Sequence, residues 1–363
     1  MLMIQATETA YWLAMAYASH LPLTRVKTIV AHWCLQQHQP LSRLFTSLPN
    51  HTAERLGFTE QDKHGIRTAG ARLAQCETWR ASLASKGVQV ITQAESSYPA
   101  ALSRYLPAPA RPLFLFAQGN PALLSRASVA IVGAQSATPE RVTVAHEVAA
   151  LLAEAGLPVI TGLGKGVGRA VADGALSVAN GQLVAVLPVG IYRALGLGQA
   201  LTDAVGQGRA LLLSPFHPTV RFTLTRALAR DRLMAALADA LLIIEATEAG
   251  AEREMAEQML GYNKPVCVWD VGSGDSQTPA GNQALIEAGG LPVSELADVL
   301  ELVESLQAAD IRQTPQASRV PPWPEVRAAE ADATFDPDGT LELLTRSGRV
   351  PEALMRRLGH KPA

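Results

Sequence analysis

Two glycine-rich turns are the segments of this sequence with the clearest capacity for chemistry. Residues 133–138 (GAQSAT) directly follow the apolar run 128–132, and residues 162–168 (GLGKGVG) directly follow the apolar run 158–161. Glycines let backbone N–H groups approach an anion closely, and a lysine inside the turn adds a positive charge. We therefore predict phosphate contacts from Gly133, Gln135, Ser136, Gly162, Gly164, Lys165 and Gly166.

The spacing of these glycines does not match the common nucleotide-binding motifs. The second turn contains GxGxG, whereas the dinucleotide motif is GxGxxG followed by an acidic residue that binds the ribose. The chain also contains no GxxxxGK[ST] loop. Two interpretations stay open: the turns bind phosphate groups, or their glycines only permit tight connections between strands and helices.

A positively charged stretch follows the second turn. Residues 193–232 contain six arginines and two aspartates, a net charge of +4, whereas the whole chain has a net charge of −2. Arg226 and Arg230 share one face of a predicted helix, and guanidinium groups suit bidentate contacts with phosphates. We predict that this stretch contacts an anion, the alternative being a solvated helix face. The acidic run at residues 245–257 would repel a phosphate backbone.

The sequence offers little for enzymatic chemistry or metal binding. It contains no GxSxG motif and no HExxH, HxxxH or CxxC pair, so we expect no catalytic activity, no cofactor and no metal. Three cysteines without such spacing fit a reducing cytoplasm. No signal-type start and no apolar run long enough for a membrane span is present. The chain is therefore expected to be cytoplasmic and to have no contact with a membrane.

The glycine-rich turns lie within a regular alternation of short apolar runs and helical stretches. The apolar runs are residues 128–132, 158–161, 183–187, 210–213, 240–244 and 265–269. Short continuous apolar strands between helices are typical of a parallel sheet covered on both faces. The predicted fold is therefore a doubly wound α/β domain. Its turns would lie at the carboxyl ends of strands, where open parallel sheets bind ligands.

Three regions are predicted along the 363 residues. Residues 1–85 carry Ala and Leu at helical spacings and are predicted to form a helical N-terminal domain. Residues 86–306 contain the sheet, which is expected to be complete by Leu291. Residues 307–363 begin with a proline-rich stretch and are predicted to be a linker and short tail, too small for an intact winged helix.

The order of these motifs resembles the DNA-processing protein A family, DprA, also called Smf. The resemblance covers roughly the first 300 residues and depends on the order of the motifs, because each of them alone is loose. The resembling pieces are residues 87–92, Tyr98-Pro99, Gly119-Asn120, residues 128–133 (SVAIVG), residues 161–168 (TGLGKGVG), residues 174–176, residues 184–189 (VAVLPV), Arg230-Asp231-Arg232, residues 241–246 (LLIIEA) and Gly281-Asn282.

The resemblance implies an extended Rossmann-like fold with a mostly parallel sheet, preceded by a small helical, SAM-like domain. It also implies a homodimer that binds single-stranded DNA and catalyses no reaction. Such a protein delivers the DNA to a RecA-type recombinase during DNA uptake and recombination, as in natural transformation. By resemblance, Arg230, Arg232 and Asn282 join the predicted nucleic-acid-binding residues.

Several positions depart from the pattern of that family, and four of them are the most relevant to the predicted pocket. Gln135 stands in the place of an arginine, and Gly168 in the place of an aspartate. Asp173 replaces a histidine, and Asp231 replaces an asparagine between two arginines. Taken together, these changes lower the positive charge of the predicted pocket, although the glycine at position 168 by itself removes a negative charge. The alternative function is therefore a nucleotide or small-ligand sensor on the same fold, acting through a protein partner.

Overall fold

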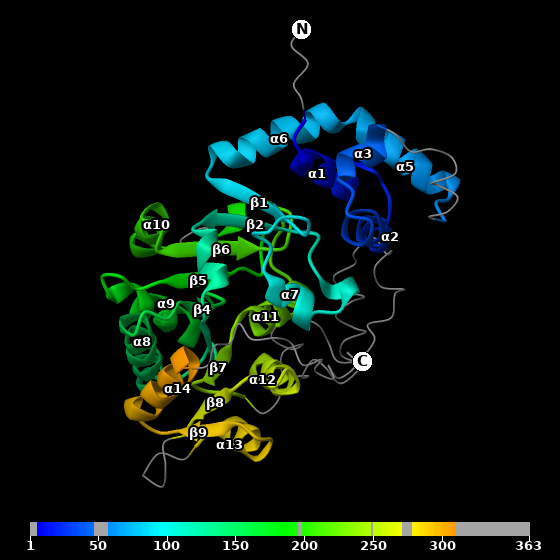
Figure 1. The fold of residues 1–363 in the computed structure, drawn as a ribbon. Helices are drawn as coiled ribbons and strands as arrows, with labels where there is room; N and C mark the ends of the chain where they lie inside the picture. Colours follow the sequence, from blue (N-terminus) through cyan, green and yellow to red (C-terminus); the bar gives the residue numbers. More distant parts are fainter. Residues whose placement is uncertain (1–5, 47–56, 195–197, 248–249, 271–277, 309–363) are drawn as a thin grey trace, which may run out of the picture.

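A nine-stranded sheet runs through the part of the chain that the structure describes (Figure 1). The structure, a computed structural model, describes residues 6–46, 57–194, 198–247, 250–270 and 278–308. The strand order is β1-β2-β6-β5-β4-β3-β7-β8-β9. The strands are β1 (Val88–Thr92), β2 (Phe114–Gly119), β3 (Val129–Val132), β4 (Val159–Thr161), β5 (Leu183–Val186), β6 (Ala210–Ser214), β7 (Ala240–Ile243), β8 (Val266–Trp269) and β9 (Leu291–Val293).

The sheet is parallel from β6 to β9 and antiparallel at one edge. There β1 pairs with β2, and β2 pairs with β6, both in antiparallel register. At the other edge β9 pairs with β8 in parallel register, with Cys267 opposite Leu291. The expectation that the sheet is complete by Leu291 is therefore wrong, because this exposed residue begins an additional edge strand.

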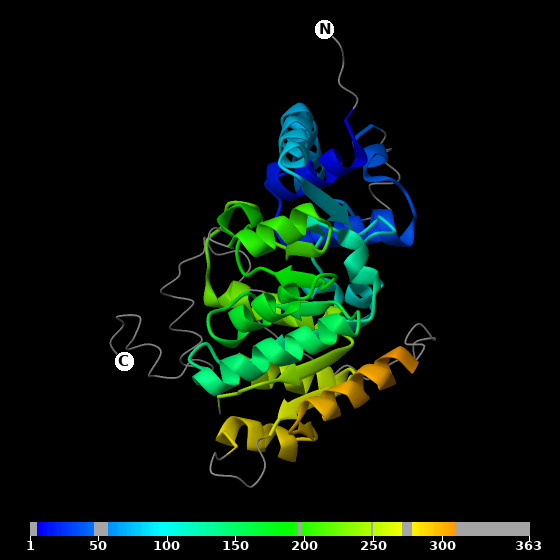
Figure 2. The same cartoon turned by 90° about the vertical axis from the view of Figure 1, so that its left-hand side faces the viewer.

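Helices cover both faces of the sheet, which confirms the predicted doubly wound α/β fold. One face carries α8 (Pro139–Glu154), α9 (Val167–Ser177), α10 (Gln199–Gly206) and α14 (Leu296–Ala308), and Figure 2 shows α8 beside α14. The other face carries α7 (Ala100–Tyr105), α11 (Leu224–Leu237), α12 (Ala251–Gly261) and α13 (Ala280–Glu287). Strand residues alternate between the two cores: Val129 and Ile131 join the first, and Ala130 joins the second.

The N-terminal helices pack against the β1 end of the sheet (Figure 1). They are α1 (Glu8–Ala18), α2 (Leu23–Val30), a π-helical turn (Ala31–Gln36), α3 (Leu41–Thr46), α5 (Glu60–Ala71) and α6 (Leu73–Ser85). Trp12 and Trp33 are buried among them, and they belong to the same apolar core as Phe116 of β2. The apolar faces of the helices are therefore covered partly by one another and partly by the sheet.

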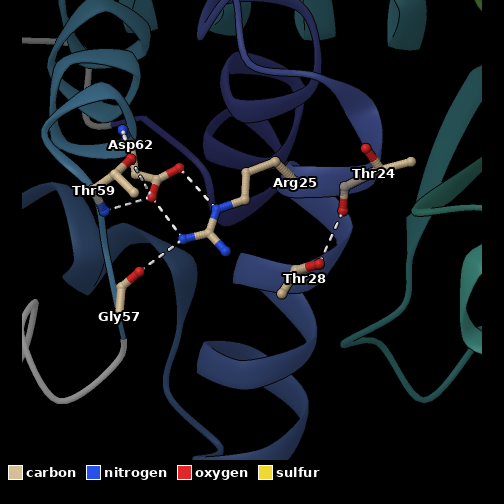
Figure 3. A network of polar contacts seen from close by, with 6 residues as sticks. All are labelled: Thr24, Arg25, Thr28, Gly57, Thr59 and Asp62. Atoms are coloured by element: carbon tan, nitrogen blue, oxygen red, sulfur yellow. Dashed lines mark hydrogen bonds and ion pairs between the residues drawn. The ribbon is translucent and has the colours of Figure 1, made fainter. Parts of the chain in front are cut away.

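Arg25 joins the start of α2 to the start of α5 (Figure 3). Its Nε donates to Oδ1 of Asp62 at 2.9 Å, and its Nη2 donates to Oδ2 of Asp62 at 2.6 Å and to the carbonyl of Gly57 at 3.0 Å. The paired guanidinium holds the pKa of the buried Asp62 carboxyl below its ordinary value. Because this pKa is depressed, the contribution to stability is complete above about pH 4 and is lost as the pH falls further.

Thr59 caps α5, and its removal should destabilise the helical region modestly. Thr59 Oγ1 accepts a hydrogen bond from the backbone N–H of Asp62, and the Asp62 carboxylate accepts one from the backbone N–H of Thr59. Loss of such a cap costs about 1 kcal/mol, so Thr59→Ala should lower the free energy of unfolding by about that amount in urea denaturation. Thr28→Ala, at an exposed position within α2, is the control with a smaller effect. Equal stability of Thr59→Ala and the wild type would contradict the capping role.

The described helices also bear on two expectations from the sequence, the absence of a membrane span and the position of the linker. None of the described helices is long and apolar enough to cross a membrane. The last described helix, α14, continues to Ala308, two residues into the region predicted as a linker. The remainder of the predicted linker and tail, residues 309–363, lies outside the described residues.

Candidate functional site

The carboxyl ends of β3, β4 and β7 meet at the point where the strand order reverses. From β3 the chain proceeds through β4, β5 and β6 in one direction, and β7 then returns to the other side of β3. Open α/β sheets bind ligands in the crevice at such a switch point. The turn at residues 133–138 follows β3, and the turn at residues 162–166 follows β4. The fold therefore brings both sequence-predicted turns to one place.

Close backbone contacts hold the two glycine-rich turns to each other and to the residues that follow β7. The N–H of Ala134 donates to the carbonyl of Glu245, which follows β7, at 2.9 Å. Gly166 has a φ of +66°, and a Cβ at this position would lie 2.5 Å from the carbonyl oxygen of Gln135. A glycine is required there by both conformation and space. The tight-turn interpretation is therefore correct for Gly166.

Gly164 shows a different environment. A Cβ at this position would meet no atom within 4 Å, so packing does not require a glycine there. The neighbouring Lys165 is exposed, as are Gln135 and Ser136 on the first turn, whereas Gly133 is partly buried at the end of β3. The edge of the sheet at these two turns, which we call the crevice, therefore offers open backbone and polar side chains to an incoming ligand.

The N-termini of two helices face this crevice. The helix α8 begins at Pro139, where the side chain of Thr138 caps it by accepting a hydrogen bond from the N–H of Arg141. The helix α9 begins at Val167, directly after the second turn. The first N–H groups of a helix lack partners within the helix, and the helix dipole adds a partial positive charge there. Both ends favour an anion in the crevice.

Arg230 reaches the second turn from α11. Its Nη1 donates to the carbonyl of Gly162 at 2.9 Å, and a side chain at position 162 would overlap this guanidinium. The Nε of Arg230 lies 2.6 Å from Oδ1 of Asp231, an ion pair between adjacent residues whose side chains are mostly buried. The structure thus brings Arg230 to the predicted turn with part of its charge compensated from within the chain.

Arg232 is held differently. Its Nη2 lies 3.2 Å from Oε1 of Glu254, on α12. The side chains of Arg232 and Glu254 line a small cleft between α11 and α12, together with Asp231, Gln258 and other residues. Arg230 therefore contacts a glycine-rich turn, and Arg232 is paired with a carboxylate on α12.

Carboxylates lie close to the predicted site: Asp231, which the sequence singled out as lowering its positive charge, and residues of the acidic run at 245–257. Burial raises the pKa of Asp231, against the opposing effect of Arg230. Burial also raises the pKa of Glu252, and the charges of Asp231 and Glu245 raise it further. Burial lowers the pKa of Arg141, while Glu245 and Asp270 oppose that change. The crevice is therefore closer to charge balance than the count of arginines in residues 193–232 suggested.

Asn282 has a positioning role in this structure. Its side-chain Nδ2 donates to the carbonyls of Ile244 at 3.1 Å and Trp269 at 2.7 Å, and its Oδ1 accepts from the N–H of Ala246 at 2.7 Å. The residue is fully buried, so its amide joins the ends of β7 and β8 and reaches no ligand from solvent. This arrangement differs from the phosphate contact expected from the resemblance.

Two of the departures noted in the sequence lie on α9. Gly168 accepts a hydrogen bond at its carbonyl from Oγ1 of Thr161 at 3.2 Å, which fastens the start of the helix to the end of β4. Asp173 forms an exposed ion pair with Arg169 at 3.0 Å. Within the described residues, no group of three or more His, Cys, Asp or Glu side chains is arranged to hold a metal ion.

Comparisons with known proteins agree on one family. Residues 89–304 match the family model described as DNA recombination-mediator protein A. A protein assigned as DNA processing protein DprA in two strains of Mycobacterium tuberculosis is 31% identical over 233 residues. That alignment spans 61% of this chain and 59% of the relative, so the chain covers less than two thirds of the length of these relatives.

Solved structures of DprA proteins share the fold. The X-ray structure of DprA from Streptococcus pneumoniae superimposes with a TM-score of 0.61 at 21% identity, covering 82% of this chain and 98% of that one. DprA from Helicobacter pylori, described for its unique single-stranded DNA binding mode, gives a TM-score of 0.51 at 20% identity, covering 60% of this chain and 96% of that one. At these identities the similarity concerns the fold.

Proposed function

The chain belongs to the DNA recombination-mediator protein A family, and from this premise we propose that it binds single-stranded DNA in the crevice at the carboxyl edge of its sheet. The observation that carries the proposal is the meeting of two exposed polar turns with the N-termini of α8 and α9 and with Arg230. The DNA-binding relative from Helicobacter pylori, which has the same fold, supports it.

The contacts follow from the geometry of the crevice. The open backbone at Gly164 and the charge of Lys165 suit one phosphate, and the side chains of Gln135 and Ser136 can donate hydrogen bonds to another. Arg230 would lower the electrostatic cost of holding both phosphates. None of these contacts reads a base, so binding would be independent of sequence and sensitive to salt.

The same family membership supports a role beyond binding. We propose that the chain acts as a homodimer, protects single-stranded DNA and delivers it to a RecA-type recombinase during DNA uptake and recombination, including natural transformation. In this role it catalyses no reaction. The description of the family as recombination mediators supports this assignment.

A sensor of nucleotides or other small ligands is the second candidate. The observation that favours it is the compensation of Arg230 by Asp231, which suits a ligand with less charge than a DNA strand. Fluorescent oligo-dT should therefore be titrated with the chain at two salt concentrations, in competition with a panel of nucleotides. Tight oligo-dT binding that weakens with salt and resists nucleotides supports the first proposal. Binding of one nucleotide with no detectable oligo-dT binding would replace it with the sensor.

Gln135→Arg should strengthen the binding of single-stranded DNA. Gln135 is exposed at the carboxyl end of β3, where it offers a phosphate neutral hydrogen bonds. Arginine would add a charge and a bidentate contact, and charge-assisted hydrogen bonds are about twice as strong. We expect oligo-dT affinity to rise about 5- to 30-fold at low salt, with the gain shrinking as salt is added.

The control for this variant is Gln89→Arg, because Gln89 is exposed on β1 at the far edge of the sheet. It adds the same charge to the protein at a distance from the crevice. Equal affinity gains for the two variants would show that net charge, and not the position of residue 135, is responsible.

A further inference from the structure

Phe222 is the most exposed of the large hydrophobic side chains that the structure describes, with 59% of its surface accessible. It lies in the segment at residues 215–223, which leaves the carboxyl end of β6 and leads into α11. None of the ring contacts among the described residues includes it. Burial in this fold therefore does not explain the aromatic ring at this position.

The segment that carries Phe222 is firmly held. Its carbonyls accept hydrogen bonds from the loop after β5: Pro218 from the N–H of Tyr192, Thr219 from Nε of Arg193, and Val220 from the N–H of Gly190, all at 3.0 Å. At one end the ring of His217 stacks on Trp79, with centroids 5.1 Å apart. At the other end Thr223 caps α11 and Nη1 of Arg226 donates to the carbonyl of Arg221. The exposed ring is thus presented on an ordered backbone.

The position of α11 places Phe222 on the side of the crevice. Because α11 connects the parallel strands β6 and β7, it must run back from their carboxyl edge. The segment at residues 215–223 directly follows the carboxyl end of β6, and it is hydrogen-bonded to the loop that directly follows the carboxyl end of β5. Phe222, the last residue but one of this segment, therefore lies at the same edge of the sheet as the two glycine-rich turns.

The surroundings of Phe222 in the chain are positively charged. Arg221 is exposed beside it, and Arg193 is exposed in the neighbouring loop. No Asp or Glu occurs between residues 204 and 230. An exposed aromatic ring beside cationic side chains is the combination that single-stranded nucleic acids require, because each base has a π-face and each nucleotide a phosphate.

We propose that Phe222 is a stacking platform for a base of single-stranded DNA, and that Arg221 contacts the adjoining phosphate. The inference rests on the proposed function and extends it from phosphate contacts to the bases. It assigns the segment at residues 215–223 to the DNA path, together with the two glycine-rich turns. A rigidly held ring loses little conformational freedom on stacking, which favours binding.

The test compares five proteins, the wild type, Phe222→Ala, Phe222→Trp, Arg221→Ala and Leu291→Ala, on two strands of equal length. One strand is oligo-dT and the other is an abasic oligonucleotide with the same backbone. Leu291 is the matched control because its side chain is 57% exposed on the edge strand β9. Melting temperatures confirm that each variant is folded.

Phe222→Ala should bind oligo-dT about tenfold more weakly than the wild type and should bind the abasic strand equally well. Phe222→Trp should retain oligo-dT binding, and its added indole fluorescence should be quenched by the bases. Leu291→Ala should match the wild type on both strands. Arg221→Ala should weaken binding to both strands and lower the salt dependence by about one phosphate.

Two results would overturn the platform while leaving the proposed function intact. One is equal oligo-dT affinity of the wild type and Phe222→Ala. The other is an equal loss by Phe222→Ala on the two strands, since an effect that does not need bases is not stacking. If the wild type itself fails to bind oligo-dT, the proposed function and the platform are both wrong.

Discussion

Arg230→Ala should weaken oligo-dT binding by about 400- to 5000-fold, the largest loss expected from a single substitution in the crevice. A charged hydrogen bond contributes about 1.5–3 kcal/mol. The substitution also leaves the carboxylate of Asp231 without its ion-pair partner, so that an uncompensated negative charge faces the bound phosphates. At a separation of about 7 Å and an effective dielectric constant of about 20, that repulsion adds about 2 kcal/mol.

Arg232→Ala is the matched comparison for this prediction. Arg232 is two residues away on the same helix, and its guanidinium pairs with Glu254 on α12. We expect a loss several-fold at most, whereas Arg230→Ala should also reduce the salt dependence by about one phosphate. Affinities should be measured by fluorescence anisotropy at several salt concentrations on proteins shown to be folded by circular dichroism. Equal losses from the two variants, or none from Arg230→Ala, would show that the contact between Arg230 and the Gly162 turn has no part in binding.

Asp231→Asn should strengthen oligo-dT binding by about 30-fold. The substitution removes the carboxylate that compensates Arg230 while preserving the size of the side chain. Removing the same repulsion of about 2 kcal/mol gives this factor. Asp203→Asn, on the exposed surface of α10, is the control for the change in net charge. A gain confined to Asp231→Asn supports the electrostatic account, and equal gains in the two variants argue against it.

Because of the Asp231 carboxylate, we also expect the affinity for oligo-dT to depend on pH. Burial raises the pKa of Asp231, with Glu254 adding to the rise while Arg230 and Arg232 oppose it. As the pH falls through this raised pKa, Asp231 becomes neutral and Arg230 becomes more available, so wild-type affinity should increase. Asp231→Asn should lose most of this dependence, and Glu252, whose pKa is also raised, would account for the remainder. An affinity of the wild type that does not change with pH would contradict this role of Asp231.

The sequence was sufficient to predict the parallel part of the fold. Strands that are buried on both faces have continuous apolar runs in the sequence, and β3, β4 and β7 are all of this kind. The edge strand β9 was harder to predict. The residues of β9 include two exposed positions, and β9 pairs with residues of β8 that lie 24 positions earlier in the chain.

The parts of the site that depend on local sequence were also predictable. The glycine-rich turns follow strands directly, and the topology of the sheet places both of them at the switch point. What could not be predicted is which charges pair, because Arg232 meets Glu254 only after α11 and α12 pack together. Burial of Asn282 and exposure of Phe222 likewise depend on tertiary contacts. The arginines of residues 193–232 indicated a local positive charge, and packing pairs Arg230 with Asp231 and Arg232 with Glu254.

A crystal structure of the chain with bound oligo-dT tests the central claim most directly. We predict one phosphate within hydrogen-bond distance of the backbone N–H groups between Gly164 and Gly166 and near Nζ of Lys165. A second phosphate should lie beside Gln135 and Ser136. DNA bound along the N-terminal helices or at the β9 edge, with both glycine-rich turns open to solvent, would contradict the assignment of this crevice.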